Sequence, residues 1–464
     1  MGLKESCAVV GVYSPNREYQ VSKHIYNALF SQQHRGQESA GIASFDGEEL
    51  LIHKDMGLVP QVFDDNTLSK LLGYVGIGHV RYSTTGESNI LNAQPFKIGT
   101  GKHGFALAYN GNLTNYDELR NRLEQRGHIF VSDSDTEVIA HILNLELRRT
   151  NSFVEAFRVV MSELEGAYSL VVLTSRGDLF AVRDPYGIRP LSFGRSDNVY
   201  VVASESIAID VLGGSLIRDV KPGEVIHLGD SGVQTYQLVE KRNYAHCMFE
   251  YVYFARPDSM INGVYVYDVR IKIGEQLAKE HPVEADNVVP VPDTSRAAAV
   301  GYSKVSGIPT IEGLMKNRYV GRTFIMPTQR EREASTRIKL NPIRSALEGK
   351  RIVLLDDSIV RGTTMRNIVS MLRKAGAKEV HVRIGCPPIK FPCKLGIDMP
   401  TRQELIASTL TVEEICSKIG ADSLGYLSID GLIKSIGLKR EDLCLGCLTG
   451  VYPVPTQETL EEYF

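Results

Sequence analysis

The segment Arg351–Met365, which reads RIVLLDDSIVRGTTM, constrains the fold of this chain most strongly. It opens with a short apolar run typical of a buried strand, continues through two acidic residues, and enters a loop that contains glycine and threonine. The next residues, Met365–Ala375, place apolar side chains at helical spacing, and Gly376 follows as a helix-ending residue. A buried strand, a short loop and an amphipathic helix predict a parallel α/β sheet, in which ligands bind at the carboxyl ends of the strands.

The loop after this strand carries the donors of an anion site. Its amides, the start of the following helix and the hydroxyls of Ser358, Thr363 and Thr364 are suited to phosphate. Asp356 and Asp357 would repel phosphate, and they are suited instead to ribose hydroxyls or to Mg²⁺. A capped helix with an acidic turn is the alternative interpretation. A P-loop is excluded because the segment lacks the pattern GxxxxGKS or GxxxxGKT.

Val353–Thr364 resembles the phosphoribosylpyrophosphate (PRPP) signature of type I phosphoribosyltransferases. The resemblance implies that the two acids contact the ribose hydroxyls and that Ser358–Thr364 holds the 5-phosphate. Earlier in the chain, Pro292–Ser295 resembles the turn that contacts pyrophosphate and metal. The implied PRPP-binding residues are Asp356, Asp357, Ser358, Arg361, Gly362, Thr363, Thr364, Arg322 and Lys339, and the implied Mg²⁺-site residues are Thr294, Asp356 and Asp357.

Residues 316–344 carry a local excess of positive charge, with eight lysines and arginines against two glutamates. The whole chain has 52 basic and 55 acidic residues, so its net charge is −3 and the excess is confined to this segment. Such a segment is suited to a pyrophosphate group, although a solvated charged loop is the alternative. It resembles the loop that closes over PRPP in the phosphoribosyltransferase family, and closure would shield the ionising C1 centre from water.

The chain divides into two regions of different pattern. Up to about Gln237, short β-branched strands and turns are mixed with a few helices, which suggests stacked α+β layers. From about Asn262, strand-like and helix-like segments alternate, which favours a doubly wound parallel sheet. We predict strands over Ala167–Leu173, Asn198–Ala203, Asn287–Val291, Arg351–Leu355 and Glu379–Ile384, and helices over Ser22–Phe30 and Thr136–Arg149, the latter capped by Ser134 or Asp135.

Cys7 stands directly before a strand-like run, AVVGVY. A small buried thiol is the default interpretation of one such residue. Polar, glycine-containing clusters occur downstream and suggest loops that converge on a pocket. These clusters are His34–Ala43, Gly78–Gly86, Tyr109–Leu113 and Ser132–Glu137.

Together these segments resemble the class II glutamine amidotransferase domain, a member of the N-terminal nucleophile (Ntn) hydrolases. The resemblance implies an α+β four-layer sandwich over residues 7–237, with two antiparallel sheets between helix layers. An α/β type I phosphoribosyltransferase domain with a parallel sheet and a C-terminal cluster-binding helical region would follow over residues 238–464. Residues 1–6 would be a propeptide whose removal leaves Cys7 as the N-terminal nucleophile. The implied roles are oxyanion stabilisation by Asn110 and Gly111, binding of the glutamine carboxylate by Arg81, and binding of its ammonium group by Asp135.

The chemistry explains why an N-terminal cysteine is useful. A free α-amino group has a pKa of about 7.7–8.0, close to the thiol's pKa of about 8.5. It can therefore accept the thiol proton and return it later, whereas the amide nitrogen of an internal cysteine is not basic. Negative charge that develops on the substrate oxygen needs preorganised donors.

Cysteine usage points to a reducing compartment. Seven cysteines in 464 residues are too sparse for a disulfide scaffold, and their number is odd. The CxxC spacing of Cys444 and Cys447 alone fits zinc, iron–sulfur, redox and coincidental interpretations. A four-thiolate site needs two further ligands, and spacing cannot choose among the available cysteines. These are Cys247, Cys386, Cys393 and Cys416.

Three segments, His246–Arg256, Phe391–Asp398 and Leu443–Cys447, resemble the ligand segments of the iron–sulfur branch of glutamine PRPP amidotransferases. The resemblance implies a structural 4Fe–4S cluster and leaves Cys386 and Cys416 as ordinary buried thiols. Arg183–Leu191 also matches the family, and we assign it a structural role. The implied cluster ligands are Cys247, Cys393, Cys444 and Cys447.

The combined resemblance implies an enzyme that converts glutamine, PRPP and water into 5-phosphoribosylamine, glutamate and pyrophosphate, the committed step of purine biosynthesis. It also implies inhibition by purine nucleotides and assembly into homotetramers. The near-neutral charge excludes a global field that would recruit nucleic acid or membrane, and no apolar run approaches the roughly 18 residues of a membrane helix. No secretory signal is evident, so we expect a cytoplasmic protein. The alternatives are another class II amidotransferase and a non-catalytic phosphoribosyltransferase-fold regulator that binds nucleotides or RNA.

Overall fold

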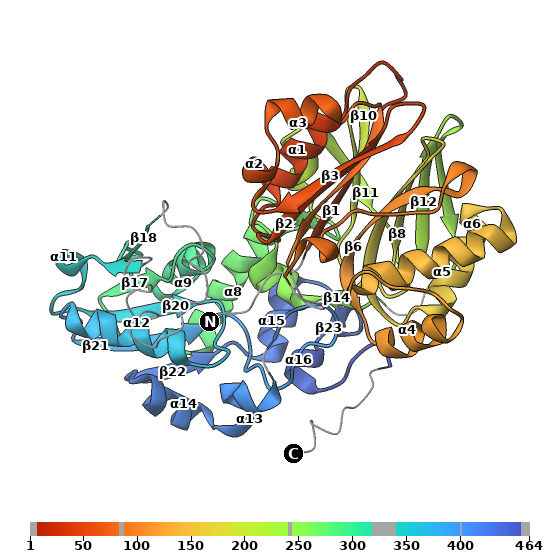
Figure 1. The fold of residues 1–464 in the computed structure, drawn as a ribbon. Coiled ribbons are helices and arrows are strands. Elements are labelled where there is room, and N and C mark those ends of the chain that lie inside the picture. The colour runs from red at the N-terminus through yellow and green to blue at the C-terminus, as the bar shows by residue number, and fades with distance from the viewer. Residues whose placement is uncertain (1–6, 83–87, 240–243, 318–339, 400, 456–464) are drawn as a thin grey trace.

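The computed structural model describes residues 7–82, 88–239, 244–317, 340–399 and 401–455. The predicted propeptide, residues 1–6, and two predicted PRPP ligands, Arg322 and Lys339, lie outside the described residues. The first half of the chain forms a two-sheet sandwich, and the second half forms a parallel-sheet region beside it (Figure 1).

Both sheets of the first half are antiparallel. The first has the strand order β11 (Ser215–Asp219), β9 (Ser192–Ser196), β10 (Val199–Ala203), β1 (Ala8–Tyr13), β4 (Val75–Arg81), β2 (Ser39–Phe45) and β3 (Leu50–Met56). The second has the order β13 (Gly232–Gln237), β12 (Glu224–Gly229), β8 (Leu179–Arg183), β7 (Gly166–Thr174), β6 (Phe105–Leu113) and β5 (Phe96–Ile98).

Strand β1 shows why the first sheet is buried on both faces. Ala8, Val10 and Val12 pack with helix α1 (Ser22–Ser31) in one core cluster. Val9 and Tyr13 point the other way and pack with side chains of the second sheet in another cluster. Successive strand residues face opposite sides, so an uninterrupted apolar strand is suited to the middle of a layered structure.

Helices cover the outer faces of the sandwich. Helices α5 (Asp135–Thr150) and α6 (Phe153–Glu163) pack on the second sheet on the side away from the first (Figure 1). The order helix, sheet, sheet, helix confirms the predicted four-layer α+β sandwich. Shorter helices in this half are α2 (Val59–Val62), α3 (Asp65–Lys70), α4 (Tyr116–Gln125) and α7 (Ile207–Asp210).

The second half contains a four-stranded parallel sheet, which confirms the predicted α/β region. Along its second strand, Ile352 and Leu354 pack against one set of helices, and Val353 and Leu355 pack against another. A parallel strand covered on both faces is apolar at consecutive positions, as this strand is. The strand order is β17 (Asn287–Pro290), β20 (Arg351–Asp356), β21 (Glu379–Ile384) and β22 (Ser423–Tyr426).

The helices of the second half lie on both faces of this sheet. One face is covered by α12 (Thr363–Lys374) and α14 (Val412–Ile419), and the other by α8 (Val266–Glu280), α9 (Arg296–Ser306) and α15 (Ile429–Ile436). Further elements of this half are the pairs β15 (Met260–Ile261) with β16 (Val264–Tyr265) and β18 (Leu314–Lys316) with β19 (Leu340–Pro342), and helices α11 (Arg344–Leu347) and α13 (Ile406–Thr409). Among the described residues, no helix has the length and apolar character needed to cross a bilayer.

Two local predictions are corrected by the structure. Ser134 caps α5 by accepting a hydrogen bond from the Thr136 amide, whereas Asp135 is the first helical residue and not a cap. Cys386 is buried as predicted, but Cys416 is only partly buried, because it lies on the surface helix α14.

Candidate active sites

Cys7 lies immediately before β1 and is 8% exposed. Its Sγ lies 3.3 Å from the carbonyl oxygen of Tyr82, and the Tyr82 amide donates toward Sγ over 3.4 Å. Burial raises the pKa of the thiol, while the Tyr82 backbone and the positive charge of Arg81 act in the opposite direction. A buried thiol with a raised pKa stays protonated until a base takes its proton.

Two charged groups flank this thiol. Arg81 ends β4, the strand hydrogen-bonded to β1, and is buried with an ion pair to Glu38 at 3.6 Å. Asp135 opens α5 and accepts a 2.8 Å hydrogen bond from the Tyr109 hydroxyl. Burial raises the pKa of Asp135 to about 6, although hydrogen bonds and Arg81 oppose the rise. Both groups act electrostatically on Cys7, so the structure brings together three residues that are far apart in sequence.

The two predicted oxyanion donors lie on β6, in the sheet that faces β1. The Asn110 side-chain nitrogen is 3.5 Å from the Ser204 hydroxyl, which also accepts a hydrogen bond from the Val9 amide. The Asn110 side-chain oxygen is buried and, within the described part of the chain, has no hydrogen-bond partner. A Cβ at Gly111 would lie 1.9 Å from the Ala167 carbonyl oxygen, so only glycine fits this position.

Arg35 is a residue of this site that the sequence interpretation missed. Its Nε donates a 3.2 Å hydrogen bond to the Cys7 carbonyl, and its side chain is buried. It belongs to the polar cluster His34–Ala43, but no spacing rule connects that cluster with Cys7.

A second candidate site lies at the carboxyl end of β20. A cavity of about 160 Å³ is lined by Tyr253 and by every residue from Asp356 to Met365. Gly362 has a left-handed backbone, φ 76°, at the start of α12, where a Cβ would lie 2.5 Å from Ile406. The predicted phosphate loop, Ser358–Thr364, therefore surrounds a real cavity and leads into a helix N-terminus.

The paired carboxylates at this site carry an unfavourable charge. Burial, followed by the repulsion of Asp357, raises the pKa of Asp356 well above its usual range. Burial also raises the pKa of Asp357 to about 6. Asp356 accepts from the Ser295 hydroxyl at 3.3 Å, and Asp357 accepts from the Ser358 hydroxyl at 2.7 Å. A ligand with hydroxyl donors or positive charge would relieve this repulsion.

The remaining predicted residues of this site are placed as follows. Thr294 lines a small cavity together with Asp356 and Asp357. Arg361 pairs with Glu404, its Nε lying 3.0 Å from the carboxylate oxygen. Arg270, which the sequence interpretation missed, lines the same small cavity, and its charge lowers the pKa of Asp357 against the effect of burial.

The segments that carry four cysteines come together where the two halves of the chain join. Strands β14 (His246–Cys247) and β23 (Leu443–Cys444) are parallel neighbours, with Cys247 paired to Cys444. Helix α16 (Gly446–Thr449) carries Cys447, whose carbonyl accepts hydrogen bonds from the Lys390 and Phe391 amides, close in sequence to Cys393.

The electrostatics of these thiols agree with their proximity. Burial raises the pKa of Cys444 to about 12, and the nearby Cys393 adds to the rise. Burial also raises the pKa of Cys447, with further contributions from Cys393, Cys386, Cys444 and Cys247. Within the described ranges, no three or more histidine, cysteine or acidic side chains are gathered closely enough to hold a metal ion. In a 4Fe–4S cluster each thiolate binds its own iron, so its ligands lie farther apart than those of one zinc ion.

Comparison with known proteins covers almost the whole chain. Residues 79–211 match the family model described as a glutamine amidotransferase domain. A protein of Methanothermobacter thermautotrophicus named amidophosphoribosyltransferase is 56% identical over 99% of this chain and 97% of its own. The protein of the same name from Bacillus subtilis is 48% identical over 97% of this chain and 95% of its own.

Solved structures agree with these relatives. The glutamine PRPP amidotransferase of B. subtilis, solved in complex with ADP and GMP, matches with a TM-score of 0.91 and 45% identity, over 99% of this chain and 100% of that chain. A structure described as the allosteric regulatory enzyme of purine biosynthesis gives the same TM-score and identity over 98% of both chains. Fold, sequence and domain content agree along the whole length: this chain belongs to the amidophosphoribosyltransferase family.

Proposed function

We propose that this chain converts glutamine, PRPP and water into 5-phosphoribosylamine, glutamate and pyrophosphate, the committed step of purine biosynthesis. One observation carries the proposal: a single chain holds both the Cys7 site and the cavity lined by Asp356 and Asp357. An assay of the purified protein with both substrates tests it, and formation of phosphoribosylamine is the expected result. We assign residues 7–237 to the first half-reaction and 238–464 to the second.

The first half-reaction is the release of ammonia at Cys7. After removal of residues 1–6, the free amino group of Cys7 takes the thiol proton, and the sulfur attacks the amide carbon of glutamine. Asn110 and Gly111 donate to the oxyanion, Arg81 binds the carboxylate, and Asp135 binds the ammonium group. Ammonia leaves with a proton from the amino group, and water then cleaves the thioester to release glutamate.

The second half-reaction is substitution at C1 of PRPP. Asp356 and Asp357 hold the ribose hydroxyls, and the loop from Ser358 to Thr364 holds the 5-phosphate. Ammonia crosses between the sites without entering solvent, where it would largely become unreactive ammonium. It attacks C1 as pyrophosphate leaves, and the carbon is inverted.

The residues present fit both implied inorganic groups. Thr294 and the two aspartates supply the oxygen donors that Mg²⁺ prefers, and bound Mg²⁺ would neutralise charge on pyrophosphate. A 4Fe–4S cluster would be held by Cys247, Cys393, Cys444 and Cys447 and would tie the segment after the first domain to the C-terminal region.

We also propose a mode of regulation, an oligomeric state and a location for this chain. The B. subtilis relative was solved with ADP and GMP, which supports regulation of this chain by purine nucleotides. We also propose a homotetramer in the cytoplasm that has no nucleic-acid partner and is not bound to a membrane.

Replacing Asp135 by asparagine is expected to raise the KM for glutamine about tenfold or more, because a charge-assisted contact to the ammonium group is lost. In the unchanged protein, the carboxylate pKa of about 6 predicts that glutamine affinity falls as the pH drops below 6. Steady-state kinetics from pH 5 to 8 measure both effects. The exposed neighbour Asp133, changed to asparagine, is the control, and equal effects of the two changes would contradict the role of Asp135.

The same substitution is expected to stabilise the fold at neutral pH. The folded-state pKa of Asp135 lies above the ordinary value of 3.8, so stability declines as the pH rises from about 3.8 through about 6. At pH 7 the ionised carboxylate therefore opposes folding. Thermal unfolding of the asparagine variant should occur at the same temperature or higher. A clearly lower midpoint would contradict the prediction that the ionised carboxylate destabilises the fold.

Protein purified without oxygen is expected to contain about four iron atoms per chain. Cys393→Ser should remove the iron, whereas Cys416→Ser, which changes a thiol on helix α14, should retain it. Metal analysis and the visible absorption spectrum check both variants. Zinc in place of iron would overturn the cluster assignment.

A further inference from the structure

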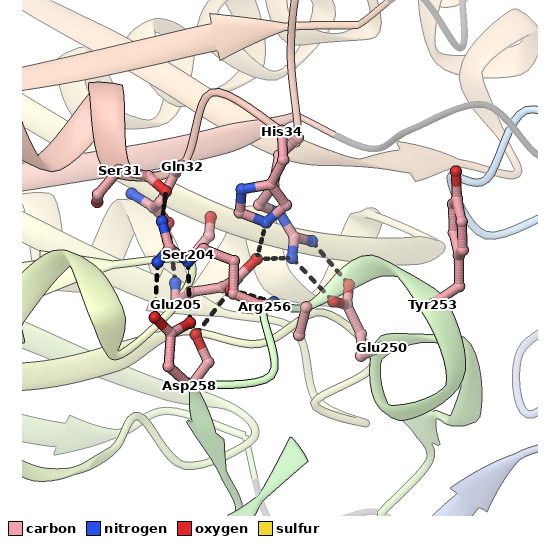
Figure 2. Close-up of polar contacts among 12 residues, drawn as sticks. Ser31, Gln32, His34, Ser204, Glu205, Glu250, Tyr253, Arg256 and Asp258 are labelled. Carbon is pink, nitrogen blue, oxygen red and sulfur yellow. Dashed lines mark hydrogen bonds and ion pairs between the residues drawn. The ribbon is translucent and has the colours of Figure 1, made fainter. Parts of the chain in front are cut away.

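A buried network of charged side chains lies between the two candidate sites. The Arg35 guanidinium donates to Glu205 at 2.7 Å and to both carboxylate oxygens of Glu250 at 2.7 and 2.8 Å. Arg189 adds a further contact to Glu250 at 3.3 Å. These side chains are at most 2% exposed, and the two positive and two negative charges balance. Figure 2 shows His34 and Arg256 meeting the network at Glu205.

One end of this network touches the nucleophile. The Arg35 Nε donates to the Cys7 carbonyl while the two carboxylates hold the other nitrogens of the same planar group. The fork geometry of guanidinium makes these contacts interdependent, because moving the carboxylate partner turns the Nε–H as well. Glu250 therefore helps to set the position of the Cys7 backbone.

The other end reaches the PRPP cavity. Glu250 is the first residue of a π-helix, Glu250–Phe254, and Tyr253 of the same helix lines the cavity. In Figure 2, Glu250 points toward the network and Tyr253 projects from the other side of the same turn. Short π-helices are rare and occur frequently at functional sites.

A third buried arginine, Arg270, holds the far end of this turn. Arg270 donates to the carbonyl oxygens of Tyr251, Tyr253 and Ala255 at 3.0, 3.0 and 2.8 Å. The same side chain lines the small cavity beside Asp357. The π-helix is thus fixed by Glu250 toward the Cys7 site and by Arg270 toward the PRPP site.

We propose that Glu250 is a positioning residue that couples the two half-reactions. It holds Arg35 and the Cys7 backbone in a fixed position relative to the π-helix that lines the PRPP cavity. Occupancy of that cavity by PRPP favours one placement of Tyr253 and Arg270, and Glu250 passes this preference to Cys7. Any such coupling is reciprocal in binding free energy. The inference rests on the proposed two-site function.

Glu250→Gln tests the inference, because it keeps the shape of the side chain and removes its charge. We expect ammonia-dependent synthesis to stay within about twofold of the unchanged protein. The ratio of glutamine hydrolysis at saturating PRPP to glutamine hydrolysis without PRPP should fall about tenfold. Asp258→Asn is the matched control, since this carboxylate borders the same network through Arg256 but is half exposed, and the ratio should not change.

A purely structural role predicts a different result. Loss of a buried ion pair that only stabilises the fold would lower the thermal midpoint and reduce both activities in parallel, with an unchanged ratio. That outcome would overturn the inference. If Glu250→Gln does not fold, Arg270→Lys tests the same coupling from the other end, and an unchanged ratio in this variant would equally contradict it. An unchanged protein without either synthesis activity would refute the proposed function itself.

Discussion

Cys7→Ala is expected to abolish glutamine-dependent synthesis and to spare synthesis from added ammonia. The alanine side chain has no atom that can form a thioester, so the loss should be about a thousandfold or more. The PRPP cavity is lined by residues 253 and 356–365 and contains no part of β1, so its chemistry should persist. Parallel assays with glutamine and with ammonium at pH 8 measure the two activities.

The matched control is Cys416→Ala, which removes a partly buried thiol from helix α14. It should leave both activities unchanged. Equal loss of the glutamine- and ammonia-dependent activities in Cys7→Ala would contradict a two-site enzyme, since it would mean that both reactions need the thiol.

Changing Asp356 and Asp357 together to asparagine is expected to have the opposite effect: PRPP use should fall, whereas glutamine hydrolysis should remain. Two charge-assisted contacts to ribose hydroxyls or metal are lost, at a cost of about 3 kcal/mol or more in binding. That cost corresponds to about a hundredfold weaker use of PRPP. Glutamine hydrolysis in the absence of PRPP should remain, because the Cys7 site is built from other residues. Initial rates at varied PRPP concentration, with glutamate release followed alongside, measure both.

The stability of this double variant provides an independent check. Burial raises the pKa values of both carboxylates, and repulsion by Asp357 adds to the rise at Asp356, so their ionisation at neutral pH opposes folding. The asparagine variant should unfold at the same temperature or higher. Asp230→Asn, at an exposed ion pair with Arg17, is a control that should alter neither PRPP use nor glutamine hydrolysis. Normal PRPP turnover in the double variant would refute the assignment of the site.

Local sequence patterns predicted the elements that position the second site. An apolar run such as the one before Asp356 is typical of the strands of a parallel sheet covered on both faces, and the structure places it in that environment. The anion loop also follows from local chemistry, because the strand, the turn at Gly362 and the helix are contiguous. The identity of the ligand, PRPP, came only from the resemblance to type I phosphoribosyltransferases.

The residues of the Cys7 site could not be grouped from local sequence patterns. Cys7, Arg81, Asn110 and Asp135 come from two different sheets and a helix start, and even the two closest in sequence, Asn110 and Asp135, are 25 residues apart. Pairing of β1 with β4 brings Cys7 beside Arg81, and packing of the second sheet against the first brings Asn110 to the same place. No spacing rule encodes either arrangement. These four residues were assigned from the family resemblance. The roles of Arg35 and Glu250 were not predicted, because their contact joins positions 215 residues apart.

The amide nitrogen of glutamine offers the most direct test of the central claim, that one chain releases ammonia at Cys7 and uses it at the PRPP cavity. The protein is supplied with PRPP and ¹⁵N-amide glutamine in a buffer that contains unlabelled ammonium in excess over the ammonia that the glutamine can release. Mass spectrometry of the trapped phosphoribosylamine should find nearly all of its nitrogen as ¹⁵N. Product whose label is diluted to the isotope ratio of the solution would contradict transfer between the two sites.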